Sequence, residues 1–584
     1  MNDAVARLRA DMAARGFDAC IVTNNDPHQS EYSAPHWLAR QYVSGFDGSA
    51  GDVVVTADDA GLWTDGRYHL QAESQLTGSG IRLFKAREPD TPTIAAWLAQ
   101  TLHEGARVAC AGHSIAAATL LELRKALEPR SIALQLTDDL VDLQWRQRPQ
   151  RSTAPVFEHP LEFAGRDTAA KLADVRTLLA ERGRDAVLLS ALPDVAWTLN
   201  LRGADVPFCP LVEGYLFVTA RRAVFCVEAA KIPATIAERL DGAGVEIAAP
   251  AALDGLVSGV NGALSLCPQT TNARLYDLAG SPVLEPALTE LSRGCKNEVE
   301  RAALREALRL DGVAVARLGH WLDTQSDGCF SEYSVGERLR AFRSELPYYV
   351  SESFETIAGF GPNAALMHYH ATEATAATVL GDGLLLVDSG GQYLGGTTDI
   401  TRTFARGRPT REQCEDYTRV LQAVIRLTGT RFRRGTRGCN IDIMARGVLW
   451  QAGIDYDCGT GHGVGQCLVV HEGPHGLSQR LIDVPLEPGM VLTNEPGVYR
   501  GGRHGVRIEN IMEIVPDRKT EFGEFLRFET LTLAPIDKRP LVKSMLDAAE
   551  IAWLDDYHAR VLAGIAGEVP ADVLPWLEEA CAPL

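Results

Sequence analysis

The chain has 584 residues, more than the ~250–300 at which a single hydrophobic core stops growing, so we expect two to four domains. Its 57 basic and 76 acidic residues give a formal net charge of −19, which argues against nucleic acid or an anionic membrane as the main partner. Apolar residues make up 46% of the chain, but no stretch approaches the ~18 consecutive apolar residues of a membrane span. The composition is therefore that of a soluble globular protein.

The cysteines indicate a reducing compartment. The 12 cysteines are scattered along the chain, no C-x-x-C pair occurs, and their spacing does not form a dense disulfide framework. The first 19 residues place Val5, Leu8 and Met12 at helical spacing among arginines, without the apolar core of a signal peptide. We therefore predict a cytoplasmic protein.

A weak internal repeat organises the first half of the chain. Residues 14–22 (ARGFDACIV) resemble residues 181–189 (ERGRDAVLL), and a second pair of similar segments follows in register, VTADDA at 55–60 and VTARRA at 218–223. Each unit has the pattern of an amphipathic helix that ends at a glycine and is followed by strands. We predict two similar α/β domains, residues 1–150 and 151–294, with a Pro- and Arg-rich linker at about 145–160.

The composition changes near Cys295, where a third domain, residues 295–584, is predicted to begin. Helical spacing of apolar residues runs through 296–322, and further helical stretches are expected at about 411–428 and 440–452. The chain ends in a polar extension, about 535–584, with another helical pattern at 541–564. We expect this extension to pack against the third domain or against a partner subunit.

A glycine-rich hairpin in the third domain carries two acidic residues. The apolar run Leu384–Val387 leads into Asp388, and after the turn a second β-rich segment carries Asp399. Two adjacent buried strands would hold both carboxylates away from water, and a buried carboxylate is costly unless it is paired or binds a metal. The hairpin therefore predicts a cation site.

Three later motifs add ligand candidates: GHGVG at 461–465, which continues to VHEGP at 470–474, then TNEPGVY at 493–499 and GVRIEN at 505–510. Their Glu495 and Glu509 stand among apolar or β-branched neighbours, an unusual setting for glutamate unless it is paired or binds a metal. The full candidate set is Asp388, Asp399, His462, Glu495 and Glu509. Its four negative charges balance two divalent cations, and this oxygen-rich, thiolate-free set suits Mn²⁺, Co²⁺, Zn²⁺ or Fe²⁺, with Mn²⁺ favoured by the carboxylate majority.

These motifs resemble those of a known family. The segments VDSGGQYLGGTTDITRTF, GTGHGVG, VHEGP, TNEPGVY and GVRIEN are similar to the motifs of the M24 metallopeptidases, which have the pita-bread fold. Within that group they resemble aminopeptidase P, and the resemblance extends to SFETIAGFGPNAALMHYH at 353–370 and to the first domain at 44–76. The long, three-domain cytosolic form of the family fits best. It implies two creatinase-like N-terminal α/β domains followed by a pita-bread catalytic domain with a C-terminal extension.

The resemblance also implies roles for individual residues. It makes the five candidates dimetal ligands, with Asp399 and Glu509 shared by both metals, and it makes Glu495 the group that also receives and relays the proton. His368 and His471 match histidines that bind substrate or the tetrahedral intermediate. Arg507 resembles an arginine that orients carboxylate ligands, and Tyr499 is expected close to it. Two other histidines, His475 and His504, are expected in loops.

The reaction implied by the resemblance removes the N-terminal residue from peptides with proline at position 2, by attack of a metal-bridging hydroxide on the Xaa-Pro bond. The family also implies a homodimer. Three alternatives remain open at this stage: a prolidase restricted to Xaa-Pro dipeptides, a creatinase-like C–N hydrolase, and a pita-bread domain that serves only as a binding module. The last two classes lack the ligand set that this chain retains.

One position departs from the family pattern. The usual His-Gly-Thr-Gly-His reads Cys458-Gly-Thr-Gly-His462 in this chain, so a cysteine replaces a histidine of the substrate pocket. A cysteine is smaller, is mostly a neutral thiol at pH 7 and cannot act as a cationic donor. The substitution is compatible with a neutral change, with weaker substrate affinity or lower turnover in a low-activity homologue, or with an additional metal ligand.

Overall fold

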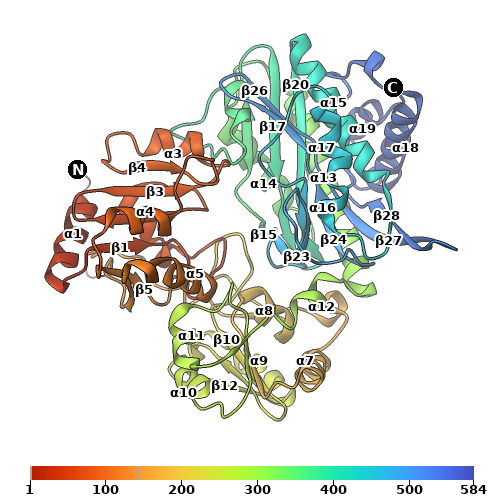
Figure 1. Ribbon diagram of the computed structural model, residues 1–584. Coiled ribbons are helices and arrows are strands. Elements are labelled where there is room, and N and C mark those ends of the chain that lie inside the picture. Colours follow the sequence, from red (N-terminus) through yellow and green to blue (C-terminus); the bar gives the residue numbers. More distant parts are fainter. Residues whose placement is uncertain (1–2, 143) are drawn as a thin grey trace. The chain divides into compact units, whose positions relative to one another are not determined.

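The computed structural model describes residues 3–142 and 144–584, and its contacts divide the chain into two compact units (Figure 1). One unit contains most of the chain up to Thr289, and the other contains Glu290–Leu584 with two short earlier segments, Pro160–Gly165 and Phe208–Pro210. The boundaries predicted at residues 150 and 294 stay predictions. Within the described residues, no helix is long and apolar enough to cross a membrane.

The first unit contains two six-stranded sheets of the same topology. The first sheet has the order β4-β3-β2-β1-β5-β6 and the second the order β12-β11-β10-β8-β13-β14, so corresponding strands occupy corresponding places. The strands of the first sheet are Ala19–Val22 (β1), Asp52–Thr56 (β2), Ala60–Thr64 (β3), Arg82–Lys85 (β4), Arg107–Ala111 (β5) and Ala133–Thr137 (β6). Those of the second sheet are Ala186–Leu189 (β8), Tyr215–Thr219 (β10), Ala223–Cys226 (β11), Val245–Ala248 (β12), Leu264–Leu266 (β13) and Val283–Leu284 (β14). The predicted structural repeat is confirmed.

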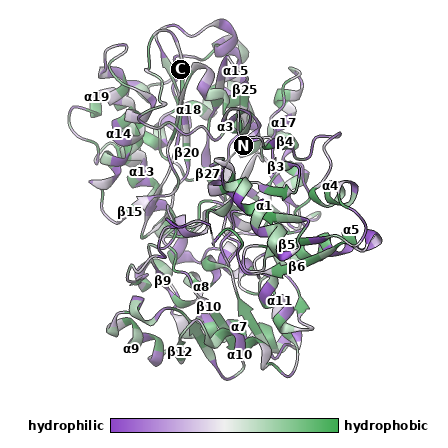
Figure 2. Ribbon diagram, turned by 90° about the vertical axis from the view of Figure 1, so that its left-hand side faces the viewer, coloured by the Kyte–Doolittle hydropathy of each residue, from purple (hydrophilic) through white to green (hydrophobic). Residues whose placement is uncertain are grey.

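Each sheet is preceded by the amphipathic helix that the sequence pattern predicts. Helices α1 (Asp3–Arg15) and α7 (Thr168–Arg182) both end at a glycine, Gly16 with φ 70° and Gly183 with φ 62°. Glycine adopts this left-handed conformation without the steric cost of a Cβ atom. Strands of the two sheets, such as β5 and β10, are mostly hydrophobic (Figure 2), and the three central residues of each of these two strands are buried.

The second unit combines long helices with several small sheets. Helices α13 (Glu298–Thr324), α15 (Arg411–Thr428) and α17 (Ile443–Trp450) lie where helical spacing predicts them, and α14 (Glu332–Ser344) is added between the first two. Asn297 begins α13 with a capping box, in which its side chain accepts from Val299 and Glu300. One main sheet has three strands in the order β16-β17-β20, which are Ile357–Phe360 (β16), Gly383–Ser389 (β17) and Ile400–Arg406 (β20). The other has six strands in the order β21-β28-β27-β24-β22-β23, which are Arg431–Arg433 (β21), Gly461–Gly463 (β22), Glu472–Leu477 (β23), Val491–Asn494 (β24), Asn510–Thr520 (β27) and Gly523–Thr530 (β28). The predicted mixed α/β architecture is confirmed.

The C-terminal extension packs against its own unit, the first of the two expected arrangements. Helix α18 (Ala548–Ile565) buries Leu554, Tyr557 and Val561 in one hydrophobic core with residues of α13 and α15, and α19 (Leu574–Ala580) adds Leu577. Full burial of one such side chain contributes about 1.5–3 kcal/mol. The extension therefore belongs to the folded core of this unit.

Candidate metal centre

The predicted acidic hairpin forms, with one addition. Strand β17 (Gly383–Ser389) pairs antiparallel with β20 (Ile400–Arg406), with Asp388 opposite Thr401, and Asp399 lies one residue before β20. The connection between them contains a further short pair of strands, β18 (Gly391–Tyr393) and β19 (Gly396–Thr397). Both aspartates are buried. The hairpin thus places two carboxylates close together in the interior.

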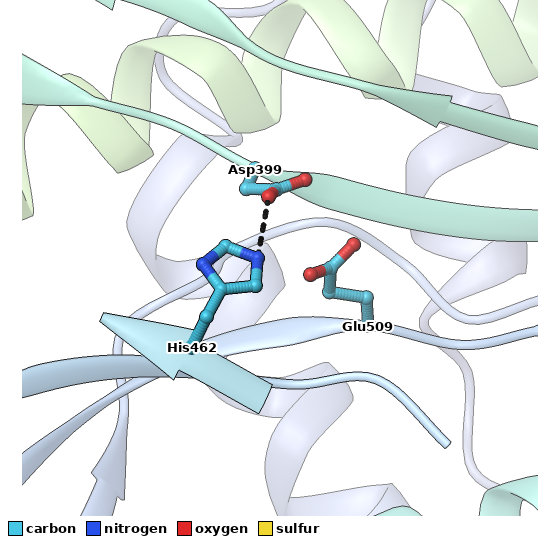
Figure 3. Close-up of side chains that lie close together, drawn as sticks. All are labelled: Asp399, His462 and Glu509. Carbon is cyan, nitrogen blue, oxygen red and sulfur yellow. Dashed lines mark ion pairs between the residues drawn. The ribbon is translucent and has the colours of Figure 1, made fainter. Parts of the chain in front are cut away.

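Asp399, His462 and Glu509 form the centre of the site, with ligand atoms that all lie within 4.8 Å of one another (Figure 3). His462 comes from β22 (Gly461–Gly463), and its Nε2 is 3.4 Å from Asp399 Oδ2. Glu509 lies between β26 (His504–Arg507) and β27 (Asn510–Thr520). The Nδ1 atom of His462 is 2.9 Å from the Gly463 carbonyl oxygen, an arrangement in which Nδ1 donates and Nε2 presents its lone pair to the carboxylates. Such a geometry is typical of a histidine that binds a metal through Nε2.

The remaining two candidates adjoin this centre. Glu495 lies between β24 (Val491–Asn494) and β25 (Gly497–Arg500), with Oε1 3.4 Å from His462 Nε2 and 3.2 Å from the donating Thr493 hydroxyl. Asp388 Oδ2 accepts from Arg507 Nη2 at 2.5 Å. The tertiary structure therefore brings all five candidates together from separate strands and strand connections of one unit.

The electrostatics of the site favour bound cations. Burial, followed by repulsion from neighbouring carboxylates, raises the pKa of Asp399 and of Glu509 well above their ordinary values. Asp388 Oδ1 and Glu509 Oε1 are buried oxygens to which no hydrogen-bond donor of the described residues is directed. A buried acceptor without a donor costs about 1–3 kcal/mol, and a hard divalent cation would satisfy both oxygens and relieve the repulsion. The donor set therefore fits the two divalent metals that its charge predicts.

Arg507 connects two of the carboxylates. Beside its bond to Asp388, its Nε donates to the Thr401 hydroxyl at 3.1 Å, and that hydroxyl donates to Glu509 Oε2 at 2.8 Å. Its Nη1 donates to the Tyr499 hydroxyl at 2.6 Å. The guanidinium thus spans Asp388, Thr401 and Tyr499, as expected of an arginine that orients carboxylates.

His471, one of the two histidines expected to bind substrate, lies next to a buried group of ion pairs. The His471 ring stands edge-on to the His462 ring, with centroids 4.4 Å apart and an interplanar angle of 87°. The next residue, Glu472, begins β23 (Glu472–Leu477) and pairs with the buried cations Arg293 and Lys296. These ion pairs fix the chain immediately after His471.

His368 follows a short 3-10 helix, η4 (Gly361–Ala365), in a loop organised by a buried glutamate. Glu332, at the start of α14, accepts from the Phe360 and Ala377 backbone amides at 2.7 and 2.8 Å. It also accepts from Asn363 Nδ2 at 3.0 Å and from the Tyr369 hydroxyl at 2.8 Å. Sequence reasoning does not find Glu332 or the partners of Glu472, because no local pattern reveals contacts this far apart in the chain.

A second buried network supports the hairpin itself. Arg343 Nε donates to Asp311 Oδ1 at 2.6 Å, and its Nη1 donates to Glu352 Oε2 at 2.8 Å. Arg343 Nη2 also donates to the Ser389 hydroxyl at 3.0 Å, while the Thr398 hydroxyl donates to Asp311 Oδ2 at 2.8 Å. Ser389 directly follows Asp388, and Thr398 directly precedes Asp399. The network therefore fixes the chain beside both aspartates. It could not be predicted from the sequence, because its members come from distant segments of the chain.

Cys458, the residue that departs from the family pattern, is half-buried and packs against the hydrophobic core that contains residues of α15 and α18. Burial raises the pKa of the Cys458 thiol to about 12, so the side chain is neutral at physiological pH. Its carbonyl oxygen accepts from Arg446 Nη2 at 3.1 Å. Among the described residues, the cluster whose ligand atoms lie within 4.8 Å of one another is made by Asp399, His462 and Glu509, and Cys458 is not part of it.

Two expectations about histidines are wrong. His475 and His504 do not lie in loops but in the buried strands β23 and β26. His504 Nε2 is 2.9 Å from Asp416 Oδ2, and burial lowers the pKa of His475 to about 4. Tertiary partners stabilise both residues inside the protein: His475 Nε2 is 2.9 Å from the Val491 carbonyl oxygen, and His504 pairs with Asp416.

Models of known families match nearly the whole chain. The model of metallopeptidase family M24 matches residues 302–516, and a model of the C-terminal region of peptidase M24 matches 524–584. Two models of the creatinase/prolidase N-terminal domain match residues 5–143 and 147–300. The latter two matches coincide with the two sheets of the first unit.

Curated relatives and solved structures agree with these models. Aminopeptidase P1 of Arabidopsis thaliana is 35% identical over 100% of this chain and 99% of its own length. Xaa-Pro aminopeptidase 1 of Dictyostelium discoideum is 36% identical over 98% of this chain and 93% of its own. The structure of X-prolyl aminopeptidase from Caenorhabditis elegans, described as a cytosolic enzyme with a di-nuclear active site, superimposes with a TM-score of 0.96 at 32% identity, covering 100% of this chain and 99% of its own.

The solved structure of a dipeptidase matches a smaller part of this chain. The Xaa-Pro dipeptidase from Bacillus anthracis is 28% identical with a TM-score of 0.52, and it covers 64% of this chain and 99% of its own. Full-length similarity is thus found with the aminopeptidases. The four family-model matches and the full-length relatives show that the chain belongs to the aminopeptidase P group of the M24 metallopeptidases.

Proposed function

We propose that this protein is a metal-dependent aminopeptidase that releases the N-terminal residue from peptides with proline at position 2. The observation that carries the proposal is the convergence of four carboxylates and one imidazole in one buried centre, with two carboxylate oxygens to which no donor of the described residues is directed. The full-length relatives named as Xaa-Pro aminopeptidases support this substrate class. A dipeptidase restricted to Xaa-Pro is the less favoured alternative.

The five residues Asp388, Asp399, His462, Glu495 and Glu509 would hold two divalent cations, and Mn²⁺ is the ion that we propose for the cell. When bound, such ions supply Lewis acidity toward a carbonyl group and a nucleophile from water at neutral pH. The carboxylate majority favours Mn²⁺ over softer ions. The assignment of Asp399 and Glu509 as the two shared ligands stays a prediction.

The protein groups would handle protons and charge. Glu495 has a partly exposed side chain and one hydrogen bond from Thr493, so it can accept a proton from the attacking water and pass it to the leaving nitrogen. His471, whose ring packs on that of His462, would donate to the oxyanion, and His368 would bind substrate. Arg507 would orient the Asp388 carboxylate.

Proline at position 2 explains why a dedicated site is needed. The bond before proline has no N–H group, and the ring fixes the local backbone angle, so peptidases that grip an extended backbone bind it poorly. A site that recognises the free N-terminus and polarises the scissile carbonyl does not need that N–H group.

The decisive experiment compares three substrates, an Xaa-Pro-Pro peptide, an Xaa-Pro dipeptide and an Xaa-Ala-Ala peptide, before and after Mn²⁺ is added to chelator-treated enzyme. We expect hydrolysis of the Xaa-Pro-Pro peptide that depends on Mn²⁺, with little cleavage of the alanine peptide. Preference for the dipeptide would identify a prolidase. A purified protein that binds no metal and cleaves no peptide would favour a binding module.

Cys458→His tests the departure from the family pattern. A histidine can donate a hydrogen bond in the pocket where a neutral thiol donates weakly, and one such bond contributes about 1 kcal/mol, so we expect kcat/KM for the Xaa-Pro-Pro peptide to rise by about fivefold. The exposed Cys329 offers a matched control, and Cys329→His should leave kcat/KM unchanged. An unaltered kcat/KM in Cys458→His would mean that the cysteine is a neutral substitution.

We also propose a cytoplasmic homodimer. The cysteine pattern and the cytosolic relative from Caenorhabditis elegans support the compartment. Large apolar side chains exposed on α17, Ile443, Met444 and Trp450, would suit a subunit interface. Sedimentation equilibrium of the purified protein measures the mass directly, and a monomer of 63.3 kDa at micromolar concentration would reject the dimer.

A further inference from the structure

Arg402 is a buried cation held by neutral acceptors. Its side chain is 2% exposed and lies one position after Thr401 on β20. The five N–H groups of the guanidinium meet six acceptors at 2.6 to 3.0 Å, and the two N–H groups of Nη2 are shared among three of these acceptors. The acceptors are the carbonyl oxygens of Thr401, Glu509, Ala534 and Pro535, Asn510 Oδ1 and the Tyr557 hydroxyl. An arginine with all its donors satisfied in this way has one well-defined position.

These acceptors come from two parts of the second unit. The Thr401 and Glu509 carbonyl oxygens belong to segments that carry the metal centre, β20 and the connection between β26 and β27, and both accept from Nη1, at 2.7 and 2.6 Å. The Ala534 and Pro535 carbonyl oxygens and the Tyr557 hydroxyl belong to the C-terminal extension and the segment leading into it. Arg402 therefore joins the extension to the backbone of a candidate metal ligand.

Helix α18 fixes the segment that contacts Arg402. The Tyr557 hydroxyl donates to the Ala534 carbonyl oxygen at 2.7 Å while it accepts from Arg402 Nη2 at 2.8 Å. The next residue, His558, accepts at Nε2 from the Ile536 amide at 3.1 Å, and burial lowers its pKa to about 4, so it is a neutral acceptor at physiological pH. Residues 534–536 are thereby tied to α18 on one side and to Arg402 on the other.

Glu509 is held at both ends by this arrangement. Its carbonyl oxygen accepts from Arg402, its amide donates to the Thr401 carbonyl oxygen at 3.1 Å, and its Oε2 accepts from the Thr401 hydroxyl at 2.8 Å. A shift of Arg402 would therefore move both the backbone of Glu509 and the residue that orients its carboxylate. Groups that orient metal ligands in this way commonly change metal affinity when they are replaced.

We propose that Arg402 and Tyr557 are positioning residues, through which the C-terminal extension holds Glu509 in its metal-binding position. This inference rests on the proposed metal site. It assigns the extension a role in metal retention, in addition to its contribution to the core.

Tyr557→Phe in the full-length, Mn²⁺-loaded enzyme tests the inference. The substitution keeps the ring and removes only the hydroxyl that joins α18, Ala534 and Arg402. The measurement is the first-order rate at which Mn²⁺ passes into excess chelator. We expect a rate roughly tenfold higher than in the wild type, the low end of the 10–100-fold effects of groups that orient ligands. A lower kcat without faster Mn²⁺ release would not support the positioning role.

Tyr417→Phe is the matched control. Tyr417 is also fully buried in this core, and its hydroxyl donates to the Asp537 carbonyl oxygen at 2.7 Å, close to the same segment. Both substitutions remove a buried hydroxyl and should cost about 1 kcal/mol of stability, but Tyr417→Phe should leave the Mn²⁺ release rate within about twofold of the wild type. Equal acceleration in both variants would show a general structural effect and overturn the inference.

Arg402→Lys provides a second variant. Lysine keeps the charge but has three donors for six acceptors, so Mn²⁺ release should be faster than in Tyr557→Phe. Wild-type release rates in both Tyr557→Phe and Arg402→Lys would reject the positioning role while the proposed function stands. A wild-type protein that retains no Mn²⁺ would reject the proposed function and this inference together.

Discussion

Asp399→Asn is expected to abolish metal binding and peptide hydrolysis. The substitution keeps the size of the side chain but removes one of the four negative charges that two divalent cations require, at the most central position of the site. We expect the metal content of the purified protein to fall to background, and kcat/KM for an Xaa-Pro-Pro peptide to fall by at least ~10³-fold, which corresponds to about 4 kcal/mol of transition-state stabilisation. Metal is measured by elemental analysis after gel filtration, and kcat/KM by release of the N-terminal amino acid.

The chain offers a matched control in Glu513→Gln. Glu513 is also a buried carboxylate, on β27 of the same unit, but it is paired with Arg301 and Arg305 rather than with the metal centre. Its substitution should lower stability and leave the metal content at the wild-type level. Full metal content and wild-type turnover in Asp399→Asn would refute the metal-ligand assignment of Asp399.

Arg343→Met is expected to have the largest effect on stability. It leaves Asp311 and Glu352 as buried carboxylates without their cation, and the removal of one partner from a buried ion-pair network costs about 3–5 kcal/mol. The expected result is a lower free energy of unfolding of the second unit, measured by urea denaturation of the metal-loaded protein. Weaker metal binding should accompany it, because Arg343 bonds Ser389 beside Asp388.

An exposed arginine on the same helix provides the comparison. Arg340 of α14 pairs with Glu337, both side chains are exposed, and such pairs contribute about 0–1 kcal/mol. Arg340→Met should therefore change the free energy of unfolding by no more than about 1 kcal/mol. If Arg343→Met and Arg340→Met were equally stable, the buried network would not support the hairpin as inferred.

Much of the fold could be predicted because the relevant signals are local. A helix or strand follows from the spacing of apolar residues over one or two dozen positions, which is why α13 and α15 lie where expected and why the two repeated units form sheets of the same order. The hairpin with Asp388 and Asp399 follows from an apolar run and a glycine turn. The ligand set followed from residue chemistry, since buried carboxylates require compensating charge.

The groups that hold the site in place could not be predicted in this way. Arg343 meets Asp311 from a separate helix, Glu332 organises the loop that contains His368, and Arg402 joins Glu509 to α18. Each pairing depends on how distant segments pack, and an arginine or glutamate in the sequence has the same local signature whether its side chain lies in water or in the core. The sequence by itself thus determined the elements, the repeat and the candidate ligands. Only the tertiary structure decided which buried charges position those ligands, because burial and pairing arise when the chain folds.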